Sequence, residues 1–270
     1  MNKNSNSRPI GIFDSGVGGL TVLNALKKQL PFENMIYVGD TARVPYGNKS
    51  EKLIQQYARE ICDLLISLDC KMIVIACNTA SSLALTYLRS SYALPIEGVI
   101  EPGVEEAIKH SRNKHIGVLG THATIRSNVY ESKLKKLNPD LMVTNQACPL
   151  FVPLAEEGWV DGEIPEKIAK YYLNPLVKNK VDTVILGCTH YPILKATITN
   201  ILPKNVHLID SAEVVAQKVK QILAQNKFAT ESKTKGHLEC LVTDMPNQFS
   251  LVADRFVDFA IGEIKAIELH

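Results

Sequence analysis

Two cysteines, Cys77 and Cys188, each stand where an apolar, strand-like run of the sequence ends. The first run reads IVIACNTAS from Ile73, and the second reads VILGCTHYP from Val184. A thiolate can take a proton and a thiol can give one, and the ordinary cysteine pKa of about 8.5 lies near neutral pH. Inverting a stereocentre by proton transfer needs a base on one face and an acid on the other, because a single base tends to return the proton to the face it left. The two cysteines therefore indicate a proton-transfer site, provided that the fold brings them to opposite sides of one small ligand.

The remaining cysteines and the overall charge narrow the class of protein. Six cysteines occur without any C-x-x-C pair, so neither a zinc ribbon nor a thioredoxin-like motif is supported, and no metal site is expected. With 30 basic and 28 acidic residues, the net charge of +2 favours neither nucleic acid nor an anionic membrane as a partner. No apolar run approaches the roughly 18 residues of a membrane span, and the polar start MNKNSNSRP lacks the apolar segment of a secretory signal. We expect a protein of the cytoplasm, where thiols stay reduced.

Short β-type runs alternate with stretches of helical spacing through most of the chain. Residues 20–30, 53–68 and 163–177 show the helical spacing. Continuous apolar strands separated by helices are typical of parallel sheets that are covered on both faces. The sequence therefore predicts α/β architecture, and its 270 residues suffice for one large domain or two modest ones. The predicted strands begin at Ile10, Met35, Met72, Ile96, Ile116, Leu141, Thr183 and Val206.

An approximate internal repeat suggests that the chain has two related halves. IGIFDS at Ile10 is similar to IGVLGT at Ile116, and the cysteines of the two strand-end motifs are 111 residues apart, close to the offset of 106 between the first pair. A chance likeness of β-rich strands is the alternative. The repeat predicts a first domain of residues 1–98 plus 211–270 and a second domain of residues 99–210.

Polar residues gather at the predicted carboxyl ends of the strands, where ligands of open α/β sheets bind. The turn DSGVGG, from Asp14, carries glycines that let backbone amides approach a ligand, but it matches neither nucleotide-binding glycine pattern. The carboxylate of Asp14 suits a base or a partner for an ammonium group; alternatively it only caps the following helix. Further turns read GDTARVPYG from Gly39, CNTAS, GTHATIRS from Gly120 and CTHYP, with EEG from Glu156 in a nearby loop. Their hydroxyls, amides and helix starts suit the carboxylates of a small ligand.

Five blocks together resemble the signature of the bacterial glutamate racemases, in that family's order: IGIFDSGVGGL, YVGDTARVPYG, ACNTAS, GVIEPG and LGCTHYP. The resemblance spans Ile10 to about Phe259. It implies two pseudo-symmetric parallel-sheet α/β domains that face each other across an active-site cleft. It also implies a cofactor-independent interconversion of L- and D-glutamate, which supplies D-glutamate for peptidoglycan, and it makes Cys77 and Cys188 the two acid/base residues.

The same resemblance assigns further site residues. Asp14 is expected to assist Cys77, His190 to assist Cys188, and Glu157 to match the acidic residue that the family has near its second cysteine. No cofactor is expected, and the protein is expected to form a homodimer. The residues expected to bind glutamate are Asp14, Ser15, Pro45, Tyr46, Gly47, Asn78, Thr79, Thr121, Thr124, Thr189 and His190.

Three other functions remain open at the level of sequence. A racemase for aspartate or another amino acid would use the same paired thiols, although relatives that act on aspartate tend to show CTE where this chain has CTH, so His190 favours glutamate. A non-catalytic carboxylate-binding protein would fit the two-domain form but has no need of two matched cysteines. In a thiol-redox protein, the two cysteines would be oxidised to a disulfide.

Overall fold

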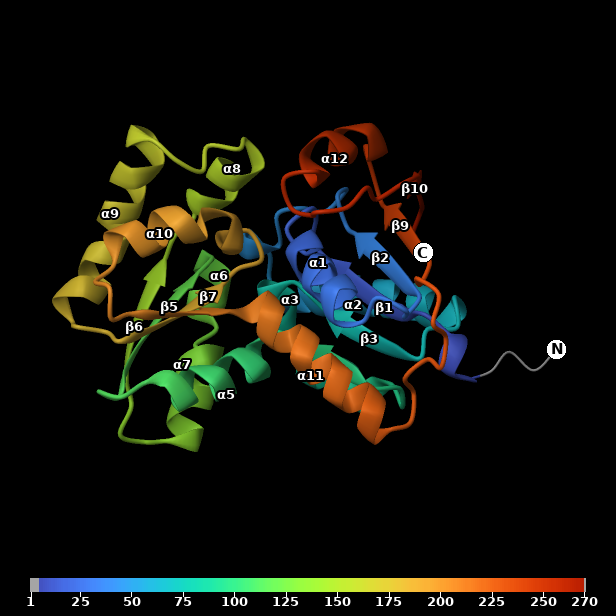
Figure 1. Ribbon diagram of the computed structural model, residues 1–270, viewed down its shortest axis with the longest axis horizontal. Coiled ribbons are helices and arrows are strands. Elements are labelled where there is room, and N and C mark those ends of the chain that lie inside the picture. Colours follow the sequence, from blue (N-terminus) through green and yellow to red (C-terminus); the bar gives the residue numbers. More distant parts are fainter. Residues whose placement is uncertain (1–4, 270) are drawn as a thin grey trace.

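The computed structural model describes residues 5–269, which form two parallel sheets side by side (Figure 1). The first sheet has six strands in the order β10-β9-β2-β1-β3-β4, and the second has four in the order β6-β5-β7-β8. The strands of the first sheet are β1 (Ile10–Asp14), β2 (Met35–Gly39), β3 (Met72–Ile75), β4 (Ile96–Gly98), β9 (Leu238–Val242) and β10 (Ile264–Ala266). Those of the second sheet are β5 (His115–Gly120), β6 (Met142–Ala147), β7 (Thr183–Gly187) and β8 (His207–Asp210).

Helices cover both sheets, as the alternation in the sequence predicted. They are α1 (Leu20–Gln29), α2 (Glu51–Ser67), α3 (Asn78–Leu83), α4 (Leu85–Ser91), α5 (Ile100–His110), α6 (His122–Arg126), α7 (Val129–Leu137), α8 (Phe151–Glu156), α9 (Glu163–Lys178), α10 (Lys195–Ile201), α11 (Ser211–Gln225) and α12 (Pro246–Ala253). Three short 3-10 helices add η1 (Ser5–Ser7), η2 (Tyr46–Asn48) and η3 (Tyr191–Leu194). None of the helices within residues 5–269 has both the length and the apolar composition needed to cross a bilayer.

The internal repeat appears in the strand order. The order β2-β1-β3-β4 in the first sheet corresponds to β6-β5-β7-β8 in the second, and the strand pairs within both sheets are parallel. Each of the eight predicted strands forms, which confirms the predicted fold class. Cys77 follows β3 and Cys188 follows β7, so the two thiols occupy equivalent positions in the two halves. The edge strand β10 was not predicted, because IKA is too short and too polar to stand out in the sequence.

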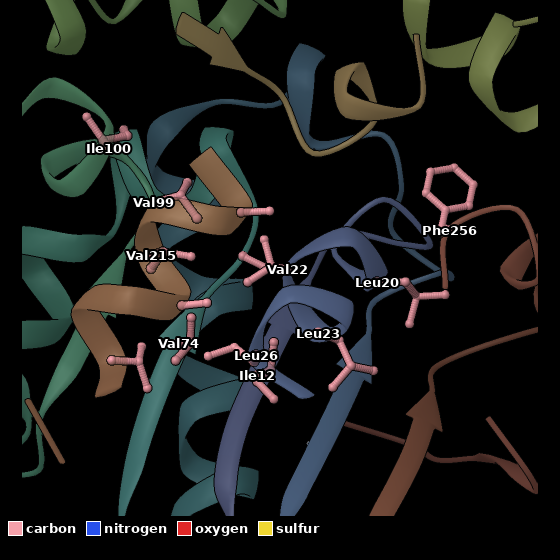
Figure 2. Packing of buried hydrophobic residues seen from close by; sticks show 14 of the residues in the cluster. Ile12, Leu20, Val22, Leu23, Leu26, Val74, Val99, Ile100, Val215 and Phe256 are labelled. Carbon is pink, nitrogen blue, oxygen red and sulfur yellow. The ribbon is translucent and has the colours of Figure 1, made fainter. Parts of the chain in front are cut away.

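One core cluster lies between the first sheet and helices α1 and α11 and continues into the second half (Figure 2), and a second packs α2 against the same sheet. Helix α1 buries Leu20, Leu23 and Leu26, whose spacing of three residues places them on one helix face. This face packs against Ile12 of β1 and against α11, whose own buried positions include Val215. Helix α11 thereby links β8 of the second sheet to the core of the first.

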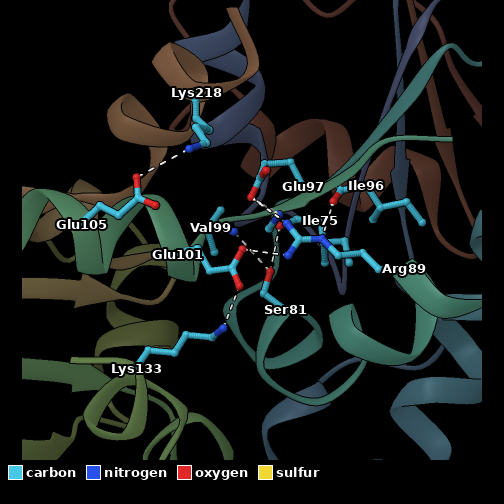
Figure 3. Close-up of polar contacts among 11 residues, drawn as sticks. Ile75, Ser81, Arg89, Ile96, Glu97, Val99, Glu101, Glu105, Lys133 and Lys218 are labelled. Atoms are coloured by element: carbon cyan, nitrogen blue, oxygen red, sulfur yellow. Dashed lines mark hydrogen bonds and ion pairs between the residues drawn. The ribbon is translucent and has the colours of Figure 1, made fainter. Parts of the chain in front are cut away.

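A network of ion pairs spans the connection between the two halves (Figure 3). Glu101, near the start of α5, binds Arg89 of α4 at 2.8 Å and Lys133 of α7 at 2.7 Å. Arg89 also binds Glu97 of β4 at 3.1 Å. We propose one domain boundary in this connection, where β4 ends the first sheet's initial run of strands, and another before α11, where β8 ends the second sheet. The first domain is then residues 1–98 plus 211–270, and the second is residues 99–210. Residues 1–4 and 270 of this division lie outside the described residues.

Candidate active site

A cavity of about 300 Å³ lies between the two halves at the carboxyl ends of their strands. Both cysteines line it, Cys77 from the first half and Cys188 from the second. The loop after β2, the starts of the helices that follow β3 and β5, the α8 region after β6 and the turn after β7 supply most of the remaining wall. Of the residues expected from the sequence, those that line the cavity are Ser15, Pro45, Tyr46, Gly47, Cys77, Asn78, Thr79, Thr121, Cys188, Thr189 and His190. Asp14, Thr124 and Glu157 are not part of this lining.

Cys77 is held as a thiol between β3 and α3. It is the N-cap residue of α3, and its Sγ accepts a hydrogen bond from the backbone N–H of Ala80 at 3.5 Å. The thiol donates to Oγ of Ser15 at 3.8 Å. Burial and the nearby charge of Asp14 raise the pKa of Cys77 to about 12, even though the helix N–H group lowers it. Cys77 is therefore protonated at neutral pH.

Cys188 has a different environment, in which a histidine links it to a carboxylate. Nδ1 of His190 lies 3.8 Å from Sγ of Cys188, and Nε2 lies 3.0 Å from Oε1 of Glu156. Burial by itself lowers the pKa of His190, but hydrogen bonds to Cys188 and Glu156 and their negative charges raise it to about 10. An imidazolium donates from both nitrogens, so His190 can stabilise a thiolate at Cys188 while Glu156 stabilises the imidazolium.

The acidic residue beside the second cysteine is Glu156, and the prediction of Glu157 was wrong in its placement. Helix α8 ends at Glu156, whose carboxylate faces His190, and Glu157 is the exposed C-cap residue. Gly158 follows with a φ of +73°, a left-handed conformation that turns the chain away from the helix. Two consecutive glutamates cannot be told apart by spacing until the phase of the helix end is known.

Asp14 lies behind the cavity wall, where it influences Cys77 through its charge. It is fully buried, and its Oδ2 accepts the backbone N–H of Gly16 at 3.0 Å. Burial raises the pKa of Asp14, while the charge of His190 lowers it. Its Oδ1 has no hydrogen-bond partner among the described residues. The charge of Asp14 thus acts on Cys77 and on His190, but the structure does not bring the carboxylate to the cavity surface as a ligand for an ammonium group.

The glycine-rich turn after β1 packs against the second half. A Cβ atom at Gly18 would lie 2.4 Å from Cε1 and Nδ1 of His190 and from Oγ1 of Thr189. The hydroxyl of Thr21 donates to the backbone carbonyl of Thr189 at 3.0 Å. Gly18 therefore admits the histidine of the opposite domain, a role that the sequence pattern alone does not distinguish from approach to a ligand.

Three threonine hydroxyls form a contact between the halves at the cavity. Oγ1 of Thr79 lies 3.2 Å from Oγ1 of Thr121 and 3.4 Å from Oγ1 of Thr124. Thr124 is fully buried and supports the other two from behind. Nearby, the hydroxyl of Tyr130 donates to Oδ1 of Asn78 at 2.6 Å, again between the halves. The Asn78 side chain can then offer only its NH₂ group to a carboxylate.

The loop after β2 depends on Asp40, which sequence reasoning did not single out. Asp40 is fully buried and accepts hydrogen bonds from Nε of Arg43, from the hydroxyl of Tyr46 at 2.5 Å and from the hydroxyl of Thr243 at 3.0 Å. The Tyr46 hydroxyl is thus used by Asp40, although the residue contributes to the cavity lining with Gly47. The available signal was the position of Asp40 directly after a strand.

The geometry defines a class of protein: two repeated α/β domains that enclose one small cavity, with a thiol from each at its wall. The family model for Asp/Glu/hydantoin racemases matches residues 10–219. The chain is 46% identical to the glutamate racemase of Geobacter metallireducens over 97% of both chains. The structure is similar to the crystal structure of glutamate racemase isoform RacE1 from Bacillus anthracis (TM-score 0.94, 36% identity, 98% of each chain). It is also similar to that of the Francisella tularensis glutamate racemase in complex with D-glutamate (TM-score 0.91, 39% identity, 97% of this chain and 98% of the other).

The chain therefore belongs to the Asp/Glu/hydantoin racemase family and is an isomerase. Family membership sets aside the non-catalytic binding protein and the redox protein that the sequence left open.

Proposed function

We propose that the protein interconverts L- and D-glutamate without a cofactor, by proton transfer between Cys77 and Cys188. The observation that carries the proposal is that the two thiols, which come from equivalent strand ends, line one cavity from its two opposite domains. The names of the relatives, together with the D-glutamate bound in one of the similar structures, support glutamate as the substrate. We further propose that the product D-glutamate serves peptidoglycan synthesis in the cytoplasm and that the protein acts as a homodimer.

The environments of the thiols support a direction for the first proton transfer. Cys188 faces the imidazolium of His190, which can donate a hydrogen bond to its sulfur, whereas burial keeps Cys77 a thiol. With L-glutamate bound, the Cys188 thiolate takes the α-proton, and the Cys77 thiol gives a proton to the opposite face of the α-carbon. D-glutamate leaves behind a Cys188 thiol and a Cys77 thiolate. This state is the starting point for the reverse reaction, in which Cys77 takes the proton from D-glutamate.

Neutral donors hold the substrate in this proposal. Arg43 is the one arginine of the first-half motifs, and its guanidinium is already bound by Asp40 and Glu60. The carboxylates of glutamate would instead meet hydroxyls, the Asn78 NH₂ group and backbone N–H groups, each worth about 1.5–3 kcal/mol to a charged acceptor. The hydroxyl donors are Ser15, Thr79, Thr121 and Thr189.

Substitution of each cysteine tests the two-thiol mechanism. Cys77→Ala and Cys188→Ala should each abolish racemisation while retaining the fold, as checked by circular dichroism. Cys240→Ala is a matched control, because Cys240 is equally buried and burial raises its pKa to about 12 as well, yet it lies on β9 outside the cavity. Near-normal racemisation by either cavity variant would show that the mechanism is wrong.

The optical rotation of glutamate and aspartate solutions tests the substrate. The purified protein without added cofactor should racemise glutamate and leave aspartate nearly unchanged. A chain shorter by one methylene costs about 1–3 kcal/mol in a fitted site, and donors left unpaired by the shorter acid add to this cost. Comparable kcat/KM values for the two amino acids would favour the broader alternative of a racemase for aspartate or other amino acids.

A further inference from the structure

Two consecutive residues near the C-terminus, Arg255 and Phe256, contact the histidine–glutamate pair of the opposite half. Phe256 is 3% exposed, and its ring lies 5.5 Å from that of His190, centroid to centroid, at an interplanar angle of 85°. Nη1 of Arg255 donates a hydrogen bond to the backbone carbonyl of Glu156. Figure 2 shows the Phe256 ring projecting from the C-terminal segment that follows α12.

This segment belongs to the first half by its strands. Strands β9 and β10, before and after it in the sequence, both pair within the six-stranded sheet. His190 and Glu156 follow β7 and β6 of the other sheet. Arg255 and Phe256 therefore join the two halves at the residues that control Cys188.

Each contact has a definite physical effect. Glu156 is the last residue of α8, and the final carbonyl groups of a helix lack partners within the helix. The guanidinium of Arg255 satisfies one of them and places a positive charge at the negative end of the helix. Phe256 covers the His190 ring with an apolar side chain, which excludes water and restricts the tilt of the ring. Together they fix both ends of the hydrogen bond between Glu156 and His190.

We propose that Arg255 and Phe256 are positioning residues for proton transfer at Cys188, and that they act by holding His190 and Glu156 in line with that thiol. The inference rests on the proposed racemase function. It predicts a selective effect, because Arg255 bonds Glu156 and Phe256 packs on His190, whereas Cys77 bonds Ser15, within the first half. The reaction half that uses Cys188 as the base should depend on the segment, and the half that uses Cys77 should not.

Halide elimination from 3-chloroglutamate separates the two halves of the reaction. One thiolate takes the α-proton, chloride leaves from the β-carbon, and the resulting enamine hydrolyses to 2-oxoglutarate and ammonium, so a second acid is not required. The L-configured substrate tests Cys188 as the base, and the D-configured one tests Cys77. Phe256→Ala should lower elimination from the L-form by roughly ten- to hundredfold, the scale expected for misplacement of a catalytic group by about 1 Å. Elimination from the D-form should stay within about twofold of the unmodified protein.

Racemisation kinetics and conservative variants add a second readout. Phe256→Ala should lower kcat for glutamate with little change in KM, because the segment does not line the cavity. Phe256→Leu should restore part of the loss by covering His190 again. Phe249→Ala is the matched control, since Phe249 is 5% exposed on the neighbouring helix α12 and packs against Tyr37. It should leave the ratio of L- to D-form elimination unchanged.

Arg255 supplies a test that does not threaten folding, because its side chain is exposed. Arg255→Met should reduce elimination from the L-form, and Arg255→Lys should restore it in part by donating to the same carbonyl. Equal losses for both chloroglutamates, or unchanged L-form elimination in both the Phe256→Ala and Arg255→Met variants, would overturn the proposal.

Titration of His190 by NMR distinguishes failure of this inference from failure of the proposed function. The groups that face or influence His190 are Cys188, Glu156, Thr189 and the buried Asp14, and Arg255 adds its charge at the Glu156 carbonyl. Phe256→Ala should loosen the hydrogen bonds to Cys188 and Glu156 that hold the pKa of His190 up, and so shift that pKa toward its ordinary value, whether or not glutamate is the substrate. An unmodified protein that does not racemise glutamate would refute the proposed function, and an unchanged His190 titration would refute the positioning role.

Discussion

Removal of the Tyr46 hydroxyl would test how the wall of the cavity is held in place. In Tyr46→Phe, Asp40 loses a hydrogen bond of 2.5 Å but keeps those from Arg43 and Thr243, so the carboxylate is not left unpaired. The aromatic ring remains, and with it the contact to Tyr57 at 5.8 Å between centroids. The change therefore isolates one charge-assisted hydrogen bond, which is worth about 1.5–3 kcal/mol.

We expect the free energy of unfolding to fall by about 1.5–3 kcal/mol, measured by urea denaturation followed by circular dichroism. The residues after Asp40 also form part of the cavity wall, so loosening them should raise KM for glutamate more than it lowers kcat. If about 1.4 kcal/mol of the lost free energy had kept the loop ordered for binding, KM should rise about tenfold. The pKa of Tyr46 is raised by burial and by the Asp40 charge, so the hydroxyl stays protonated and keeps donating at neutral pH.

Tyr57→Phe provides the control, because Tyr57 packs on the same ring but does not bond Asp40. It should leave both the urea midpoint and KM nearly unchanged. An unchanged midpoint in Tyr46→Phe would show that the bond to Asp40 contributes nothing to stability. A lower midpoint with normal KM would show that Asp40 stabilises the domain without ordering the cavity wall.

Three further predictions follow from other sites. Lys71→Met should lower the free energy of unfolding by about 3–5 kcal/mol, since it removes the ion pair with Glu33 at 2.5 Å and the hydrogen bonds that Lys71 donates to the carbonyls of Asn6 and Phe228. Adding Glu33→Leu should restore only part of the urea midpoint, because those carbonyls stay unpaired. Thr79→Val, which removes a hydroxyl shared by the two halves, should reduce kcat/KM for glutamate by at least tenfold, measured by circular dichroism of the product, whereas an unchanged value would remove Thr79 from the proposed binding set. The pKa of His190, about 10, lies above its ordinary 6.5, so its stabilising contribution is complete below pH 6.5 and is lost as pH rises through 10. Urea unfolding of the unmodified protein and of His190→Gln should accordingly converge in stability between pH 6.5 and 10, and a constant difference would contradict the assignment.

The sequence by itself determined the α/β architecture, the repeat and the two thiol positions. Strands buried on both faces must be apolar without interruption, so β3 and β7 stand out as short runs with a polar residue where each run leaves the core. Parallel strands in one order place equivalent residues at equivalent sheet edges. Cys77 and Cys188 could therefore be paired from the repeat alone.

Only the tertiary structure decided which neighbouring groups act on those thiols. Where helix α8 ends determines that Glu156, and not Glu157, faces His190. The hydroxyl of Tyr46, a residue expected to bind the ligand, instead donates a hydrogen bond to Asp40. A helix start such as the one after Cys77 lowers the pKa of a thiol. Burial and the charge of Asp14 nevertheless raise the pKa of Cys77, because desolvation depends on atoms from many segments.

The contact of Phe256 with His190 shows the same limit most clearly. The two residues are far apart in the sequence, lie in different halves of the molecule and belong to no shared motif. Periodicity and strand-end position report on local structure and on the order of strands in a sheet. Which side chains from one half cover the reactive groups of the other depends on how the two domains pack together, and that packing exists only in the folded chain.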